Sequence, residues 1–154
     1  MSDKTIKLCY DELELSISGY EKYREVEDDS WANVAWKVNN YAIKFENYSY
    51  DMMSYEVEEL RDKLKKFING ELQEYTCFVP MESAFKVRFY PKGDEYGMYY
   101  EYKDKSKLIE NKNAEIIVHP NDDVGALDEM VGVSFILDDE DIKKLYDYLE
   151  EITK

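Results

Sequence analysis

The chain is poor in the residues that build most metal and redox sites. Its 154 residues include only two cysteines and one histidine. Cys9 and Cys77 lie far apart in the sequence and form no CxxC pair, so the common zinc and thiol-redox motifs are absent. Because a free cysteine usually behaves as a small buried hydrophobe, we expect two buried free thiols, and neither a metal nor a cofactor.

Long hydrophobic runs are also missing. No apolar stretch approaches the roughly 20 residues that cross a bilayer. The polar start of the chain, Met1–Lys4, has no apolar signal core. These absences predict a cytoplasmic protein that makes no membrane contact. The length fits one domain, residues 1–154, and we find no internal repeat or linker.

Basic residues are scarce relative to acidic ones. Lysine and arginine together number 20, against 35 for aspartate and glutamate, which gives a net charge of -15. Each phosphate contact needs a cation, so this balance argues against a nucleic-acid partner and favours a basic protein partner. Many soluble proteins, however, are acidic for solubility alone. Charge by itself therefore leaves both interpretations open.

Glycine is infrequent as well, and no catalytic signature is present. The six glycines are scattered and form neither a P-loop nor a GxGxxG motif. The acidic run 121–129 is not an EF-hand, because Gly125 and Gly132 occupy positions that need oxygen ligands. A dyad of Cys77 and His119 has no oxyanion-hole signature beside it. A pair of catalytic carboxylates, as in glycoside hydrolases, cannot be recognised among 35 acidic residues. Since no catalytic motif is found, we predict that the protein is not an enzyme.

Apolar residues alternate with polar ones through most of the chain, which is typical of strands with one buried face. The alternation predicts a hairpin over 31–48 and further strands at 6–10, 13–18, 75–79, 85–90, 97–102, 114–118 and 131–137. In the hairpin we expect Asn39 and Asn40 to form a two-residue turn. We expect the second strand to present an apolar face made of Tyr41, Ile43 and Phe45.

Two segments have the helical period instead. The first spans 54–70, with Ser54 as the expected N-cap and Gly70 as the left-handed residue that ends the helix. The second follows Asp138 or Asp139 and closes the chain. Its apolar stripe is Ile142, Leu145, Tyr146, Leu149 and Ile152. We predict an α+β fold: a twisted, mostly antiparallel sheet of about seven to eight strands with both helices on one face.

Tyrosine is unusually frequent, with 15 in the chain. Four of them gather in one predicted hairpin: Tyr96, Tyr99, Tyr100 and Tyr102. Tyrosines in strands usually form a half-buried scaffold. Exposed tyrosines are also frequent in binding hot spots, because they bring a large contact area at a small entropic cost. Scaffold and binding face both remain open for this hairpin.

The order of these elements, together with a few short motifs, resembles that of one protein family. The motifs are Gly19–Tyr20, Trp31–Val34, Glu59–Leu60 with Leu64, Phe78–Glu82, Phe85–Val87 and Phe135–Leu137. With this layout the chain resembles the WapI-type immunity proteins, which are small proteins paired with bacterial wall-associated polymorphic toxins. Over most of the chain, the predicted strands and helices follow each other in the same order as in this family.

The resemblance implies a non-enzymatic cytoplasmic protein that binds and neutralises a cognate toxin domain. Many such toxins are nucleases with basic clefts, which an acidic inhibitor would complement in charge. The acidic loops and the tyrosine hairpin supply the predicted contact residues: Asp28, Asp29, Asp94, Glu95, Tyr96, Asp122, Asp123, Asp128 and Glu129. The alternative is an acidic binding module for another regulatory protein or a small ligand, and an acid hydrolase ranks third.

Overall fold

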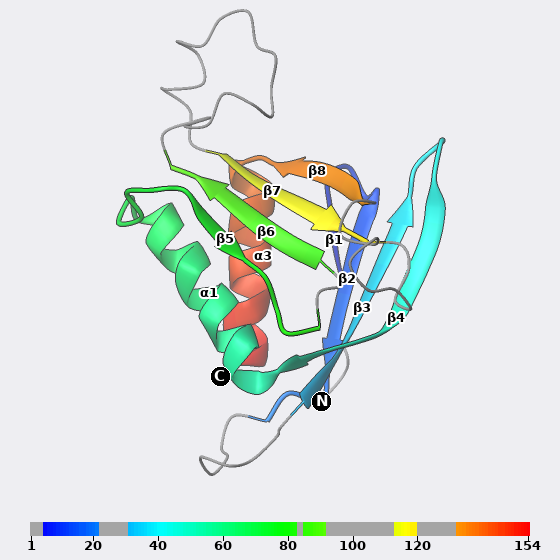
Figure 1. Ribbon diagram of the computed structural model, residues 1–154, viewed down its shortest axis with the longest axis horizontal. Helices are drawn as coiled ribbons and strands as arrows, with labels where there is room; N and C mark the ends of the chain where they lie inside the picture. The colour runs from blue at the N-terminus through cyan, green and yellow to red at the C-terminus, as the bar shows by residue number, and fades with distance from the viewer. Residues whose placement is uncertain (1–4, 22–30, 83–84, 92–112, 120–131) are drawn as a thin grey trace, which may run out of the picture.

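The computed structural model describes residues 5–21, 31–82, 85–91, 113–119 and 132–154. Within these ranges the chain forms eight strands and two helices (Figure 1): β1 (Thr5–Leu8), β2 (Leu13–Ser18), β3 (Trp31–Asn39), β4 (Lys44–Met53), α1 (Ser54–Ile68), β5 (Thr76–Phe78), β6 (Phe85–Tyr90), β7 (Asn113–Val118), β8 (Val133–Leu137) and α3 (Asp139–Ile152). The predicted α+β class is confirmed. The strand predicted at 97–102, with its tyrosines, lies outside the described residues.

The strands form two antiparallel sheets where the sequence led us to expect one. Sheet 1 has the order β1-β2-β3-β4, and sheet 2 has the order β5-β6-β7-β8. Helix α1 follows β4 directly and carries the chain away from sheet 1, so that β5 begins a second sheet. Apolar alternation predicts strands but does not say which strands pair, so it could not reveal this division.

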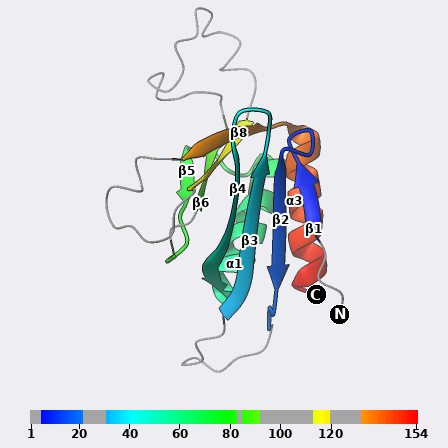
Figure 2. The same cartoon turned by 90° about the vertical axis from the view of Figure 1, so that its right-hand side faces the viewer.

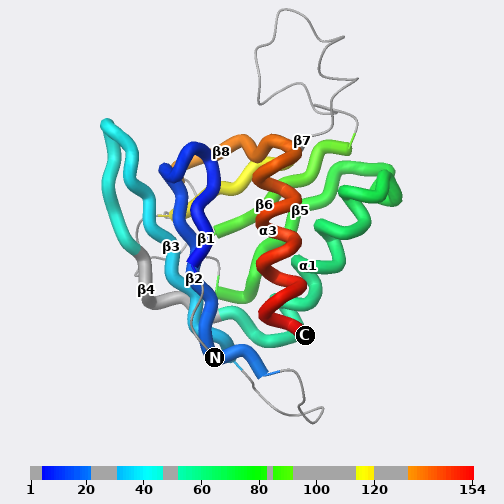
Figure 3. The backbone as a smooth tube through the Cα atoms, turned by 180° about the vertical axis from the view of Figure 1, so that it is seen from behind, coloured from blue at the N-terminus to red at the C-terminus, as the bar shows by residue number. Residues whose placement is uncertain are grey.

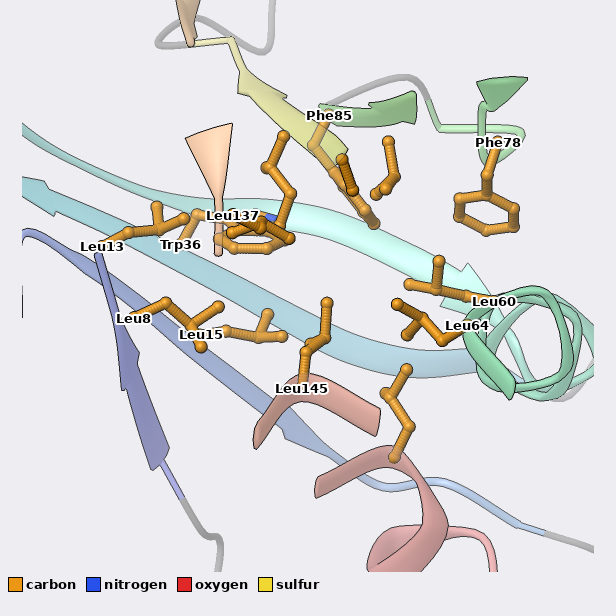
Figure 4. Close-up of a cluster of buried hydrophobic side chains, with 14 of the residues drawn as sticks. Leu8, Leu13, Leu15, Trp36, Leu60, Leu64, Phe78, Phe85, Leu137 and Leu145 are labelled. Atoms are coloured by element: carbon orange, nitrogen blue, oxygen red, sulfur yellow. The ribbon is translucent and has the colours of Figure 1, made fainter. Parts of the chain in front are cut away.

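The two sheets and the two helices share one core. Figure 2 shows sheet 1 in front of α1 and α3, and Figure 3 shows the two helices next to each other from behind. The ring of Trp36 on β3 lies 4.9 Å from that of Phe85 on β6, so the sheets are in direct contact. Leu64 of α1 and Leu145 of α3 join the same cluster (Figure 4).

Alternation along each strand supplies this core from one face. On β2, Leu13, Leu15 and Ile17 are at most 4% exposed, while the residues between them are partly exposed. Burying a side chain of this size stabilises the fold by about 1.5–3 kcal/mol. The alternation that predicted the strands therefore also predicted which side faces inward.

The β3–β4 hairpin is confirmed, but its turn is longer than the two residues expected. Asn39 pairs with Lys44, so the loop runs over residues 40–43. The side chain of Asn40 accepts hydrogen bonds from the amides of Ala42 at 2.9 Å and Ile43 at 2.7 Å. The side chain of Asn40 therefore closes a four-residue loop. A two-residue turn would be closed by backbone hydrogen bonds and would not need this side chain.

Helix α1 begins without the serine cap that we expected. Met53 is the N-cap residue and Ser54 is the first residue of the helix, so the Ser54 prediction is wrong. The reason is that β4 remains extended up to Met53, which puts the extended N-cap conformation there. The amide of Met53 instead donates to Oε1 of Glu56 at 3.0 Å.

The end of α1 is as predicted. Gly70 has φ +73°, which is the left-handed conformation that glycine adopts without strain. Its amide donates to the carbonyl of Phe67 at 3.2 Å, and the amide of Glu71 donates to that of Lys66 at 2.8 Å. These two bonds form a Schellman motif that satisfies the last carbonyls of the helix.

Helix α3 starts at the predicted cap and buries almost the predicted stripe. Oδ1 of Asp138 accepts a hydrogen bond from the amide of Asp141 at 2.8 Å. The difference lies in the tyrosines, because Tyr148 is buried while Tyr146 is only partly so. The Tyr148 hydroxyl accepts from the amide of Ile17 at 2.7 Å, a bond between α3 and β2 that the helical period could not predict.

Candidate functional site

The nine predicted contact residues all lie outside the described residues. They are Asp28, Asp29, Asp94, Glu95, Tyr96, Asp122, Asp123, Asp128 and Glu129. Their contact role stays a prediction. The described residues offer other surfaces and a few candidate catalytic groups.

Cys9 is buried in an unusual turn between β1 and β2. Cys9, Tyr10 and Asp11 have φ values of +54°, +58° and +65° in succession. Left-handed backbone costs roughly 1–2 kcal/mol for each such residue, so other bonds must hold the turn. The Cys9 amide donates to Oδ1 of Asp141 at 3.1 Å, and the Cys9 thiol donates to the carbonyl of Ile136 at 3.8 Å.

The thiol of Cys9 is chemically inert in this position. Burial, followed by the nearby carboxylates of Asp141, Asp138 and Glu12, raises its pKa from 9.0 to about 12. A thiol nucleophile acts as the thiolate, and this environment disfavours the thiolate. Cys9 therefore meets the expectation of a buried free thiol.

The Cys77–His119 dyad is excluded by strand register. Cys77 pairs with Arg88 on β6, and Phe85 of the same strand pairs with Val118, which precedes His119. The two side chains are thus two strands apart and about 13 Å apart along the strands. Cys77 is also exposed, contrary to expectation. The next residue on β5, Phe78, is the one whose side chain is buried.

A buried ion pair on sheet 2 involves the best candidate for a catalytic acid, Glu115. This carboxylate is 7% exposed and lies 3.7 Å from the guanidinium of Arg88 on the neighbouring strand. The hydroxyl of Ser134 donates to its other oxygen, and the hydroxyl of Tyr90 lies 3.5 Å from the first. Both carboxylate oxygens are held by fixed partners, so the pair is a structural element of the sheet.

The outer face of sheet 1 neutralises its own charge. Lys7, Glu14, Lys37 and Glu46 are successive cross-strand partners, so their signs alternate across all four strands. Lys37 and Glu46 form an ion pair at 3.5 Å. Opposite charges in facing positions stabilise a sheet and leave little net field. A hollow of about 270 Å³ beside this row is lined by Thr5, Glu14, Ser16, Ala35, Trp36, Lys37 and Glu46.

The acids on the exposed face of α1 are also engaged with neighbours. The hydroxyl of Tyr20 donates to Oε2 of Glu58 at 2.5 Å. Glu59 forms an ion pair with Lys63 at 3.5 Å, one helical turn away. This face is an ordinary solvated helix surface with both signs of charge.

The most exposed aromatic side chains of the described residues lie at one end of sheet 1. Tyr10 is 95% exposed in the β1–β2 turn, and Tyr41 is 100% exposed in the β3–β4 loop. Both turns lie at the same end of the sheet in Figures 2 and 3, and the amide of Asn39 donates to the carbonyl of Glu12 between them. We call Tyr10, Asp11, Tyr41 and Ile43 the tyrosine end.

The tyrosine end was not predicted from the sequence, because alternation placed Tyr10, Tyr41 and Ile43 in strands. Tyr10 was expected to end a strand, and Tyr41 and Ile43 to lie on an apolar face. Ile43 is in fact 44% exposed. The acidic pair Asp11–Glu12 and the pair Asn39–Asn40 are the signals that mark both turns.

The described part of the chain contains neither of two further kinds of feature, a metal-binding cluster and a membrane-spanning helix. Within those ranges, His, Cys, Asp and Glu form no group of three or more that could hold a metal ion. Neither described helix has both the length and the apolar character needed to cross a bilayer.

Comparison with known proteins gives a family match. Residues 7–154 match the model of a family described as the immunity protein WapI-like family. No curated protein and no solved structure matches the chain significantly. The match spans nearly the whole chain and confirms the resemblance inferred from the sequence.

Proposed function

The chain belongs to the immunity protein WapI-like family, and we propose on that premise that it binds a cognate toxin domain in the cytoplasm and blocks it through an acidic surface. Membership of the family implies toxin neutralisation by a protein that is not an enzyme. The proposal adds the location, the acidic contact surface and the basic character of the toxin.

The net charge of -15 is the observation that carries the acidic surface. A nuclease must hold a polyanion, so its cleft is basic, and a nuclease is the toxin class that such an inhibitor fits best. Opposed fields steer the two proteins together at rates that approach 10⁸–10⁹ M⁻¹s⁻¹, on the order expected at low salt. Fast capture is useful to an inhibitor that must act before the toxin reaches its substrate.

Co-expression tests the proposal. The toxin domain encoded by the neighbouring gene is placed under an inducible promoter, with and without this chain. We expect cells to survive induction with the chain and to die without it. A variant that truncates the chain within β3 serves as the control for expression load. Death in the presence of the folded chain would contradict the proposal.

A further inference from the structure

We propose that the tyrosine end, Tyr10, Asp11, Tyr41 and Ile43, is a contact surface for the toxin, with its two tyrosines as anchors for lysine and arginine side chains. This inference rests on the proposed function and specifies which part of the described surface carries it. It is separate from the nine contact residues predicted from the sequence.

The first anchor is held on a fixed turn. The Cys9 amide is bonded to Asp141 of α3 at 3.1 Å, and the amide of Glu12 closes the turn onto the carbonyl of Cys9 at 3.1 Å. Tyr10 lies in the turn that these two bonds hold, and its side chain is 95% exposed. An exposed tyrosine on a rigid turn loses little backbone entropy when a partner binds it, which favours its use as an anchor.

The second anchor is held in a similar way. The side chain of Asn40 bonds to the amides of Ala42 and Ile43, and its own amide donates to the carbonyl of Ile43 at 3.0 Å. These bonds close the loop around Tyr41, whose side chain is fully exposed. The loop thus presents Tyr41 together with the partly exposed Ile43, a combination of ring face and apolar contact.

The charge around the anchors determines the chemistry of the partner. Asp11 is exposed within the turn itself. Because Cys9 is bonded to Asp141, the first turn of α3 lies at the same end, where Asp138, Asp139 and Glu140 are exposed. Lysine and arginine bind both carboxylates and the faces of tyrosine rings. A basic protein surface is therefore the partner that fits both groups.

Two other described faces, the outer face of sheet 1 and the exposed face of α1, fit such a partner less well. The cross-strand row on sheet 1 alternates in sign, and acids of α1 already contact Tyr20 and Lys63. The α1 face has one half-exposed ring, Tyr55 at 46%, and its acids lie among Lys63 and Lys66, whereas both rings of the tyrosine end are at least 95% exposed. The tyrosine end combines these rings with exposed carboxylates.

The test measures binding of the purified toxin domain encoded by the neighbouring gene. The variant is Tyr10→Asn with Tyr41→Ser; asparagine adopts left-handed backbone readily, so the turn keeps its conformation. Tyr55→Ala is the matched control, because Tyr55 is 46% exposed on α1, at the opposite end of β4. We expect the dissociation constant of the double variant to rise about 30-fold, mostly through faster dissociation.

The control should bind within about twofold of the parent, and all three proteins should have the same thermal midpoint. Equal binding by the parent and the double variant would overturn this inference alone. An equal loss in Tyr55→Ala would overturn it too, since the effect would not be specific to this surface. Absence of binding by the parent chain would overturn the proposed function as well.

Discussion

Glu56 shows how one buried carboxylate joins distant parts of the chain. It is 4% exposed, and its two oxygens accept from the amides of Met53 at 3.0 Å and Met81 at 2.6 Å. Met53 ends β4, and Met81 follows β5, so the carboxylate connects the start of α1 to both sheets. Without it, both amides would lose a charged acceptor at a site that is only partly open to water.

We expect Glu56→Ala to lower the free energy of unfolding by about 2–4 kcal/mol, because two amides lose their hydrogen bonds to a charged acceptor. Glu56→Gln keeps one acceptor oxygen and should lose less. Glu59→Ala, on the exposed side of the same helix, should stay within about 0.5 kcal/mol of the parent. Urea unfolding measures all three. A loss in Glu56→Ala no larger than that in Glu59→Ala would contradict this role.

The two cysteines should differ sharply in reactivity. Cys77 is exposed, whereas the pKa of Cys9 is raised to about 12 by burial and by nearby carboxylates. At pH 8 we therefore expect an aromatic disulfide reagent to label one thiol quickly and the other only through unfolding. Cys77→Ser should abolish the fast phase. Two fast phases in the parent would show that Cys9 is accessible.

The raised pKa of Cys9 also has a consequence for stability. The unfolded chain loses this proton near pH 9.0, whereas the folded chain keeps it until about pH 12. The contribution of Cys9 to stability is therefore full below pH 9 and declines as the pH rises toward 12. Urea midpoints of the parent and of Cys9→Ala, compared at pH 8 and pH 10.5, should converge at the higher pH. A constant difference would contradict the assignment.

At the scale of the element, the end of α1 depends on backbone conformation alone. A Cβ at Gly70 would meet nothing within 4 Å, so steric crowding plays no part. The cost of replacing it comes from φ +73°. We expect Gly70→Ala to destabilise the protein by about 1 kcal/mol and Gly70→Asn by less, since asparagine tolerates this conformation. Thermal melting distinguishes them, and equal midpoints for all three would contradict the Schellman assignment.

Elements with a strong period were predictable from the sequence, and their spatial relations were not. The stripe of α3 and the left-handed Gly70 follow from spacing and backbone preference. The division into two sheets does not, because pairing depends on contacts between distant segments, such as that of Trp36 with Phe85. The tyrosine end could not be predicted for a related reason. The apolar alternation continues into both turns, so it does not show where the strands end or that Asn40 closes its loop by side-chain hydrogen bonds.

At the scale of the whole molecule, charge should control the rate of association with the toxin. Changing Asp122, Asp123, Asp128 and Glu129 to lysine should slow association at least about tenfold at low salt, with a smaller effect at high salt where the field is screened. The matched control reverses Glu71, Glu74, Glu82 and Asp147, which gives the same change in net charge. Stopped-flow mixing measures both. Equal rates for the two variants would remove the predicted loops from the contact surface.

Stoichiometric inhibition tests the central claim most directly. The activity of the purified toxin domain encoded by the neighbouring gene is measured while this chain is added in increasing amounts. Because the proposed mechanism is occupation of the toxin surface, activity should fall linearly and reach zero at one chain per toxin. Full toxin activity in the presence of excess folded chain would contradict the account.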